Sequence, residues 1–144
     1  MKKEEIKANT IYYTTNYETL EEVVRKTDEI KNSDLLKSEF ILRLGIYVTN
    51  KSGLVMVTFN KSGKMNSCMV ISRHIDGLGQ YAWLDFCWCD KHYPQLMRKY
   101  QDEITKLCQY YGVERVQART NRSIKALNRK YGFCEIAKII ERKV

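Results

Sequence analysis

One acidic residue stands inside the most apolar stretch of the sequence. Asp85 lies in YAWLDFCWC (81–89), a run that is apolar on both sides of its alternation and is therefore expected to be a buried, central strand. A carboxylate in such a strand must be paired or lose its charge. We take Asp85 as a candidate general base, with a structural hydrogen bond to a neighbouring loop as the alternative. Glu114 and His74 are weaker candidates, and His74 is expected to close a turn.

The same run carries two cysteines at alternate positions, Cys87 and Cys89. Residues i and i+2 of a strand face one side, which raises the question of a metal site. Zinc sites usually combine two such pairs, and the other cysteines, Cys68, Cys108 and Cys134, form no second pair. We therefore expect core thiols and no metal. The odd number and irregular spacing of the cysteines also argue against a disulfide framework.

The excess of basic residues lies in the last third of the chain. Residues 1–90 contain 12 Lys/Arg and 12 Asp/Glu, whereas residues 91–144 contain 13 and 5 and so carry the whole net charge of +8. A one-sided basic surface attracts anions, such as nucleic acid, an acidic protein or a phosphorylated cofactor. Ordinary solvated helix faces account for part of this charge in any case.

The length of 144 residues predicts a single domain, 1–144. Apolar residues make up 44% and aromatics 11%, which is enough for a core and argues against disorder. We find no apolar run long enough to cross a membrane and no apolar signal-peptide stretch near the start. The expected location is the cytoplasm or a similar reducing compartment, without a membrane partner.

The amino-terminal part is expected to form one helix and a series of antiparallel strands. After a short strand at 10–14, Thr15 and Glu18 have the spacing of a capping box. They begin a helix over about 16–31, which is followed by a helical turn near 33–39. Four strand-like runs separated by turn-like stretches with glycine then predict a meander. These runs are 40–48, 54–60, 65–73 and 81–89.

The remainder of the chain predicts a helix, a strand, a second helix and a last strand. Pro94 suits the first position of a helix, and Gly112 suits the left-handed residue that ends it. A short strand over 113–119 and a basic helix over 122–131 follow. The whole is an α+β domain with a mixed, mostly antiparallel sheet flanked by helices.

The stretch NRSIKALNRKYGF (121–133) places an Asn after a strand, then a short basic helix, then Gly-Phe before another strand. This order resembles the end of the GNAT family, the GCN5-related N-acetyltransferases, whose pattern reads N-x-x-A-x-x-L-Y-x-x-x-G-F. The residues that fall on this spacing are Asn121, Leu127, Gly132 and Phe133. The order of elements before it also fits, apart from one extra strand-like run, for which we take 65–73.

The resemblance implies a way of binding acetyl-CoA. In the family the central strand splays away from its neighbour, and the pantetheine arm lies in the gap. The pyrophosphate rests on backbone N–H groups at the start of the next helix, where unpaired donors and the helix dipole favour anions. The residues that the resemblance places at the cofactor are Phe86, Cys87, Trp88, Cys89, Lys91, His92, Arg98, Lys99 and Asn121.

Two features depart from the family pattern. The family loop before that helix carries glycines that let the backbone approach the phosphates, whereas CDKHYPQLMRK (89–99) has none and places Asp90 there. Basic side chains would compensate less rigidly. The family Tyr that often protonates the leaving thiolate is Asn128 here, which donates a hydrogen bond but supplies no proton. Tyr131 is the candidate substitute, with a core contact as the alternative.

Two functions therefore stay open. The first is an enzyme that moves acetyl from acetyl-CoA to an amine, with Asp85 as base and strand N–H groups polarising the thioester carbonyl. The second is a catalytically degenerate GNAT-fold protein whose basic last third binds nucleic acid or an acidic protein, because a fold does not guarantee its usual chemistry. The ending also resembles small phage-encoded relatives, some of which are internal virion or assembly proteins.

Overall fold

A five-stranded sheet with the order β1-β2-β3-β4-β5 forms the centre of the molecule. The strands are β1 (Tyr12–Tyr13), β2 (Gly53–Phe59), β3 (Met65–Asp76), β4 (Gly79–Cys89) and β5 (Arg115–Gln117). Neighbouring strands pair antiparallel, except that β4 and β5 are parallel. The computed structural model describes residues 5–30, 36–119, 124–134, 136, 142 and 143. Within them the predicted α+β fold class and mixed sheet are confirmed.

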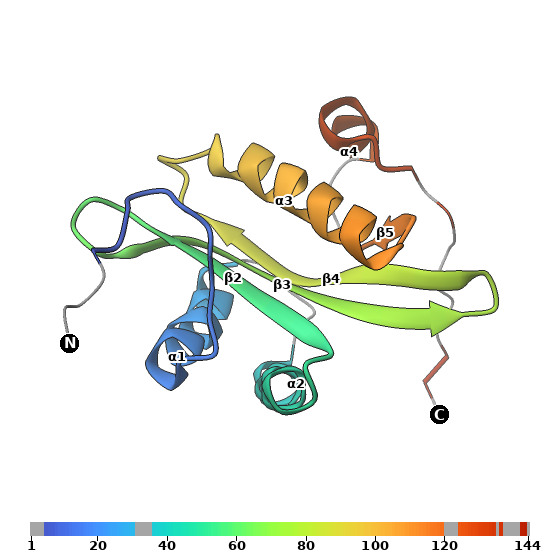
Figure 1. Cartoon of the computed structure of the whole chain (residues 1–144), viewed down its shortest axis with the longest axis horizontal. Coiled ribbons are helices and arrows are strands. Elements are labelled where there is room, and N and C mark those ends of the chain that lie inside the picture. The colour runs from blue at the N-terminus through green and yellow to red at the C-terminus, as the bar shows by residue number, and fades with distance from the viewer. Residues whose placement is uncertain (1–4, 31–35, 120–123, 135, 137–141, 144) are drawn as a thin grey trace.

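Helices cover both faces of the sheet. They are α1 (Tyr17–Lys26), extended by the short 3-10 helix η1 (Thr27–Glu29), then α2 (Lys37–Asn50), α3 (Leu96–Tyr111) and α4 (Ile124–Tyr131). In Figure 1, α1 and α2 lie on one side of the sheet, and α3 and α4 lie on the other. In the described part of the chain, no helix has the length and apolar character needed to span a membrane.

The predicted strand over 40–48 is wrong, because this run lies inside α2. Phe40, Leu44 and Tyr47 are buried, and their spacing is that of one helix face. Three apolar neighbours on the outer face are exposed and made the run look apolar throughout: Ile41, Leu42 and Ile46. The run 65–73, in contrast, forms most of β3. The extra strand-like run, which we took to be 65–73, is therefore 40–48.

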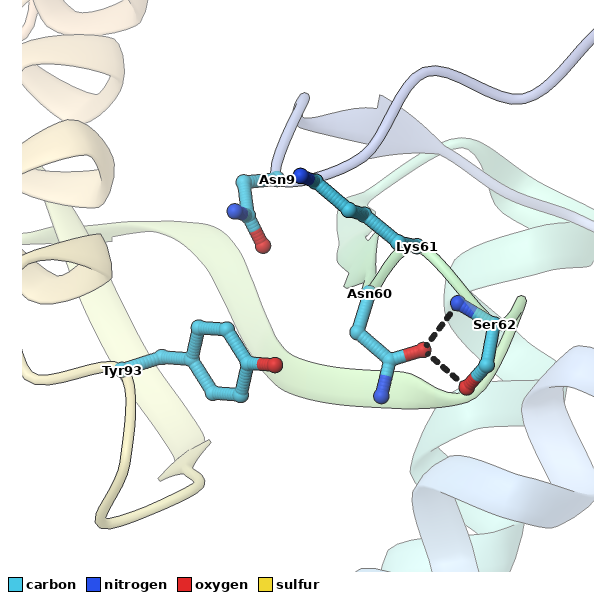
Figure 2. A pocket seen from close by; sticks show the side chains of 5 residues that line it. All are labelled: Asn9, Asn60, Lys61, Ser62 and Tyr93. Atoms are coloured by element: carbon cyan, nitrogen blue, oxygen red, sulfur yellow. Dashed lines mark hydrogen bonds between the residues drawn. The ribbon is translucent and has the colours of Figure 1, made fainter.

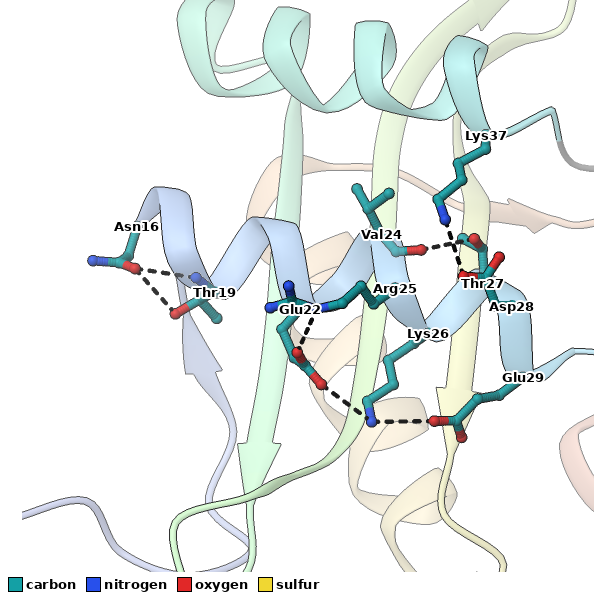
Figure 3. Close-up of polar contacts among 10 residues, drawn as sticks. All are labelled: Asn16, Thr19, Glu22, Val24, Arg25, Lys26, Thr27, Asp28, Glu29 and Lys37. Atoms are coloured by element: carbon teal, nitrogen blue, oxygen red, sulfur yellow. Dashed lines mark hydrogen bonds and ion pairs between the residues drawn. The ribbon is translucent and has the colours of Figure 1, made fainter.

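The first helix begins one residue later than the capping box predicts. Asn16, not Thr15, is the N-cap residue, and its Oδ1 accepts hydrogen bonds from the backbone N and the Oγ1 of Thr19, at 3.1 and 3.3 Å. Figure 3 shows this cap at one end of α1 and a set of ion pairs at the other. There the Lys26 ammonium lies 3.3 Å from the carboxylates of both Glu22 and Glu29.

The helix α3 ends as the sequence predicts but begins later. Gly112 has a φ of 68° and follows the last helical residue, because the left-handed region suits a residue without a Cβ. Pro94 lies two residues before the first helical residue, Leu96, so its predicted place at the first helical position is wrong. The loop before α3 is correspondingly 90–95.

Two hydrophobic clusters lie on the two faces of the sheet, and β3 contributes to both. The cluster under α1 and α2 includes Val23, Phe40 and Phe86, and the cluster under α3 includes Met69, Tyr100 and Ile104. The first eight residues of β3 are all buried. The central buried strand is thus β3, whereas β4, which we expected there, lies one place further out and is mostly half-buried.

Near the carboxyl end, the predicted strand 113–119 is confirmed as β5 and the predicted helix 122–131 as α4. The predicted last strand falls largely outside the described residues, and so does Asn121. Leu127 and Tyr131 are half-buried in α4.

Candidate functional site

The two parallel strands stay paired over a short stretch only. Within the described residues, the ladder between β4 and β5 ends at the pair Trp83–Gln117. The ladder between β4 and β3 continues to Cys89. Beyond Trp83, β4 therefore has a described strand partner on one side only. This is the arrangement expected at the start of a splay between the two strands.

A β-bulge in β4 follows directly after the last of these pairs. Val70 of β3 pairs with Phe86 and Ile71 pairs with Leu84, so Asp85 is the extra residue. A bulge re-aims side chains. Here Leu84 packs with the cluster under α3, whereas Phe86 packs with the cluster under α1 and α2. Asp85 also points to the α2 side, because its hydrogen-bond partners include side chains of α2.

The carboxylate of Asp85 is buried and held by three side chains. Its side chain is 1% exposed. Its Oδ1 accepts hydrogen bonds from the Tyr47 hydroxyl at 2.7 Å and the Arg43 Nη1 at 3.2 Å, and its Oδ2 accepts one from the Ser72 Oγ at 2.6 Å. These partners come from α2 and β3 rather than from a loop. Burial and the neighbouring carboxylate raise the pKa of Tyr47 to about 12, so its hydroxyl stays protonated and donates.

The hydrogen bonds continue from Ser72 to His74. The Nε2 atom of His74 lies 2.7 Å from the Ser72 Oγ, and the imidazole stacks on the ring of Tyr81 with centroids 5.5 Å apart. His74 lies within β3, so the expectation that it closes a turn is wrong. We call the five connected residues the carboxylate network: Arg43, Tyr47, Ser72, His74 and Asp85.

Three members of the carboxylate network were missed by the sequence reasoning. Arg43 and Tyr47 are four residues apart, which places them on one face of a helix, but this signal was lost once 40–48 was read as a strand. Ser72 and His74 are two residues apart and so share a face of β3. That spacing was visible in the sequence, although nothing in it pointed to Asp85.

A glycine of β2 makes room for one of these residues. A Cβ added to Gly53 would lie 2.5 Å from the Cγ of Tyr47 and 2.7 Å from its Cδ2. Real Cβ atoms do not approach other heavy atoms so closely. Gly53 therefore lets the Tyr47 ring pass close to β2 and present its hydroxyl to Asp85.

Two of the predicted cofactor residues, Phe86 and Trp88, turn their side chains to the α1 and α2 face. The ring of Phe86 lies 5.3 Å from that of Phe40. The Lys26 ammonium lies 4.3 Å from the centre of a Trp88 ring, an attractive cation–π geometry. These side chains serve the core, so contact with a pantetheine arm would come from the backbone of β4.

Cys87 and Cys89 are half-buried thiols. The Sγ of Cys87 lies 3.5 Å from the Sδ of Met97 in α3. The Sγ of Cys89 lies 3.1 Å from the carbonyl oxygen of Tyr93, and burial raises the pKa of the Cys89 thiol. Among the residues that the structure describes, no group of three or more His, Cys, Asp and Glu could hold a metal ion.

The loop 90–95 between β4 and α3 is shaped by Asp90. Its carboxylate accepts a hydrogen bond from the backbone N of His92 at 2.8 Å, and its backbone N donates to the carbonyl of Asn66 at 2.9 Å. Asp90 thus has a structural role that its negative charge alone did not predict. The side chains of Lys91 and His92 are exposed.

The start of α3 has no side-chain cap, since the N-cap residue Gln95 makes no such hydrogen bond. Arg98 and Lys99 lie exposed in the first turn, and the Lys99 ammonium donates to the carbonyl of Asn9 at 2.7 Å. The structure therefore brings the predicted phosphate residues to one end of α3. They are Lys91, His92, Arg98 and Lys99.

A polar cavity of about 280 Å³ lies beside this loop. Figure 2 shows Tyr93 of the loop and Asn9 of the amino-terminal segment pointing towards the turn between β2 and β3. In this turn, the Asn60 Oδ1 accepts hydrogen bonds from the backbone N and the Oγ of Ser62, at 3.0 and 2.7 Å. The cavity is on the β2–β3 side of the loop, away from the pairing of β4 with β5.

The two predicted catalytic residues of α4 stand apart from Asp85. Asn128 is exposed and Tyr131 is half-buried. In Figure 1, α4 lies on the α3 side of the sheet, whereas Asp85 faces α2. Neither Asn128 nor Tyr131, both within the described residues, makes a hydrogen bond with Asp85. The structure thus does not bring the three together as one catalytic group.

Comparison with known proteins identifies the fold. A predicted acetyltransferase from Clostridium acetobutylicum, solved with acetyl-CoA, has a TM-score of 0.71 at 11% identity and covers 93% of this chain and 96% of its own. An aminoglycoside 6′-N-acetyltransferase from Acinetobacter baumannii has a TM-score of 0.73 at 9% identity, with 94% and 97% covered. Glucosamine-6-phosphate N-acetyltransferase from Arabidopsis thaliana has a TM-score of 0.69 at 15% identity, with 93% and 97% covered.

The sequence itself matches no protein-family model and no curated protein. The likeness is therefore one of structure, and the fold is the GNAT-like fold that the sequence predicted. The likeness extends over nearly the whole length of both chains.

Proposed function

We propose that this protein is an acetyltransferase that binds acetyl-CoA where β4 and β5 separate and transfers the acetyl group to an amine. The observation that carries the proposal is the end of the parallel ladder at Trp83–Gln117, followed within two residues by a bulge with a buried carboxylate. A strand that has lost its neighbour offers backbone groups to a ligand. The solved neighbour from Clostridium acetobutylicum with acetyl-CoA supports this choice of ligand.

The charges near α3 fit the phosphate groups of CoA. Arg98 and Lys99 are exposed in its first turn, and Lys91 lies in the loop before it. Backbone N–H groups at a helix start favour anions. No side chain caps this helix, but the N–H groups of Leu96 and Met97 already donate to the carbonyls of Tyr93 and Pro94. The loop has no glycine, and the Asp90 carboxylate already accepts a hydrogen bond from the backbone N–H of His92. The phosphates would therefore rely mainly on flexible basic side chains. We therefore expect binding that weakens with salt.

In the transfer itself, the amine would attack the thioester carbonyl, and CoA would leave as a thiolate. Most of the rate would come from holding the two reactants together and from polarising the carbonyl. The carboxylate network supplies the groups that could accept the proton of the amine, Asp85 and His74. Tyr131 remains our candidate for protonating the thiolate. Asn128 would donate a hydrogen bond at most. The free cysteines fit a reducing, cytoplasmic location.

The test is calorimetric titration of the full chain with acetyl-CoA at moderate salt, together with melting curves. A ligand that binds only the folded state raises the melting temperature. We expect one site with micromolar affinity and release of CoA when primary amines are added. No heat and no shift at millimolar acetyl-CoA would refute the proposal. The GNAT fold would then serve an interaction role, and nucleic acid and acidic proteins would be the partners to test.

A further inference from the structure

The hydrogen bonds of Ser72 determine which ring nitrogen of the neighbouring His74 carries the proton. Ser72 has a single hydroxyl proton, and an ionised carboxylate accepts hydrogen bonds but donates none. The contact of 2.6 Å with Asp85 therefore uses that proton. The contact of 2.7 Å with His74 then requires a proton on Nε2. Neutral His74 is consequently the Nε2–H tautomer, and its Nδ1 is left as a proton acceptor.

Exposure increases along this chain of hydrogen bonds. The Asp85 side chain is 1% exposed and Ser72 is 3% exposed, whereas His74 is half-buried. Asp85 also has both oxygens occupied by three donors. A base must come within hydrogen-bond reach of the proton that it removes. Of the two groups in the network that can take up a proton, Asp85 and His74, the more exposed is His74.

The network lies beside the point where β4 and β5 separate. Ser72 is paired across the sheet with Trp83, the last residue of β4 that pairs with β5. His74 is paired with Tyr81. The network thus runs along the paired end of β4, on the α2 face, and Asp85 follows directly after the point where the ladder stops.

We propose that His74 takes up the proton of the acceptor amine, that Ser72 holds its ring in the required tautomer, and that Asp85 stabilises the resulting imidazolium. This inference rests on the proposed acetyl transfer. In the step, the amine nitrogen bonds to the acetyl carbon, and the carbon–sulfur bond breaks with its electron pair left on sulfur. The proton lost by the amine goes to Nδ1 of His74, and water protonates the thiolate where no side chain does.

The charged and titratable groups near the imidazole come from three elements besides its own strand. His74 stacks on Tyr81 of β4, and the Arg115 guanidinium of β5 lies 5.4 Å from the centre of that ring. Through Ser72 the imidazole is joined to Asp85, which also accepts hydrogen bonds from Arg43 and Tyr47 of α2. Asp76 lies two residues further along β3. Two of the charges are paired with each other, because Arg115 lies 2.7 Å from Asp76. The carboxylate of Asp85 is the charge linked to His74 through a hydrogen-bonded hydroxyl, so it has the most direct influence on the ring.

The hydrogen-bond geometry can be tested without any substrate. The chain has two histidines, so His92→Gln leaves one imidazole for nitrogen NMR. We expect the Nε2–H tautomer for neutral His74 and its loss in Ser72→Ala, with Ser72→Thr restoring it. The opposite tautomer, or a ring that does not respond to Ser72→Ala in a folded protein, would overturn the inference whatever the enzyme does.

The role in transfer is tested with acetyl-CoA and four primary amines: ethanolamine, free lysine, glucosamine 6-phosphate and a lysine-containing peptide. His74→Asn should lower the turnover number about 100-fold, remove the rise in rate with pH and leave the KM for acetyl-CoA unchanged. Ser72→Thr should retain more activity than Ser72→Ala, and Asp102→Asn on the exposed face of α3 is the control.

The outcomes separate the two proposals. A protein that does not bind acetyl-CoA refutes the proposed function. A protein that binds it but transfers acetyl to none of the four amines refutes transfer and with it the role of His74. Undiminished turnover with an unchanged pH profile in His74→Asn refutes only this inference, and the proposed function stands.

Discussion

The two halves of the proposed site are built in opposite ways. The centre of the carboxylate network is buried, because the side chain of Asp85 is 1% exposed and accepts hydrogen bonds from a helix and from a neighbouring strand. The loop 90–95 with the first turn of α3 is exposed, has no side-chain cap, and carries charges on long side chains. One half is preorganised by packing, and the other relies on exposed basic side chains, of which Lys99 donates to the carbonyl of Asn9.

This difference predicts how each half of the site responds to substitution. A buried network loses stability if one member is replaced, because its partners are left unsatisfied. An exposed basic cluster tolerates changes one at a time, because each charge contributes little alone. The glycine-free, exposed loop before α3 and the fully partnered Asp85 are the two sides of this contrast. We expect substitutions in the buried half to have the larger effect on stability, and those in the exposed half the smaller.

Replacing Asp85 with Ala should have the largest effect on stability. The change leaves the hydroxyls of Tyr47 and Ser72 without their acceptor and Arg43 without its counter-charge. We expect a loss of about 3 kcal/mol in the free energy of unfolding, measured by urea titration. Asp102→Ala on the exposed face of α3 is the control. Equally small losses in the free energy of unfolding for both variants would contradict the proposed contrast between a buried and an exposed half.

The glycine beside Tyr47 gives a second test of the buried half. Gly53→Ala would push a Cβ into the Tyr47 ring, so we expect a loss of about 1–3 kcal/mol. Gly45 of α2 is the matched control, because nothing lies within 4 Å of its added Cβ. Gly45→Ala should raise the free energy of unfolding by up to about 1 kcal/mol. Melting curves of both variants suffice, and a stabilising Gly53→Ala would show that Tyr47 is not held in place.

Asn121 tests the cofactor directly. If it contacts acetyl-CoA, Asn121→Ala should weaken binding by about 1–2 kcal/mol, the scale of one hydrogen bond to a polar ligand. The measurement is calorimetric titration, with Asn50→Ala at the exposed end of α2 as the control. An unchanged affinity in a folded Asn121→Ala protein would show that Asn121 does not contact acetyl-CoA.

The exposed half should respond to charge and to salt. Arg98→Glu reverses one charge in the first turn of α3 and should weaken acetyl-CoA binding about tenfold at low salt, an effect of roughly 1.4 kcal/mol. Lys37→Glu makes the same change in net charge on the other side of the sheet, beside Asp28. Titrations at two salt concentrations should show the Arg98 effect shrinking at the higher one. Equal effects of both reversals would mean that only net charge matters.

Most of the fold could be predicted from the sequence, because β2, β3 and β4 are short apolar runs separated by glycine-containing turns, and α3 has a clear apolar face. The exception was α2. Its outer face carries Ile41, Leu42 and Ile46, so the polar positions that reveal a helical period were missing. The end of α1 and the start of α3 differed by a few residues, because local hydrogen bonds decide such boundaries.

The candidate site could be predicted only in part. Asp85 was visible as a charge in an apolar run, whereas its partners lie 13 to 42 residues away in the sequence. Such contacts depend on the bulge in β4 and on the packing of α2, neither of which leaves a local pattern. The basic end of α3 was visible from composition, because exposed charges need no tertiary contact to be recognised.

The smallest expected effect is at the end where β4 and β5 stay paired. There Arg115 of β5 forms an ion pair with Asp76 of β3. The hydrogen bond from Arg115 and the backbone N–H of Leu78 lower the pKa of Asp76. A carboxyl with a lowered pKa contributes stability above its unfolded-state pKa and loses it as the pH falls through the folded-state value.

Asp76→Asn should therefore lower the melting temperature slightly at neutral pH, and the difference from the unchanged protein should narrow as the pH falls from about 5 towards 3. Asp102→Asn, an exposed carboxyl without an ion pair in the described structure, should give no such pH dependence. A difference for Asp76→Asn that stays constant through this range would show that its charge does not hold β5. The strand would then be kept in place by its three backbone pairs with β4 alone, and the separation of the two strands beyond Trp83 would begin from a weaker anchor.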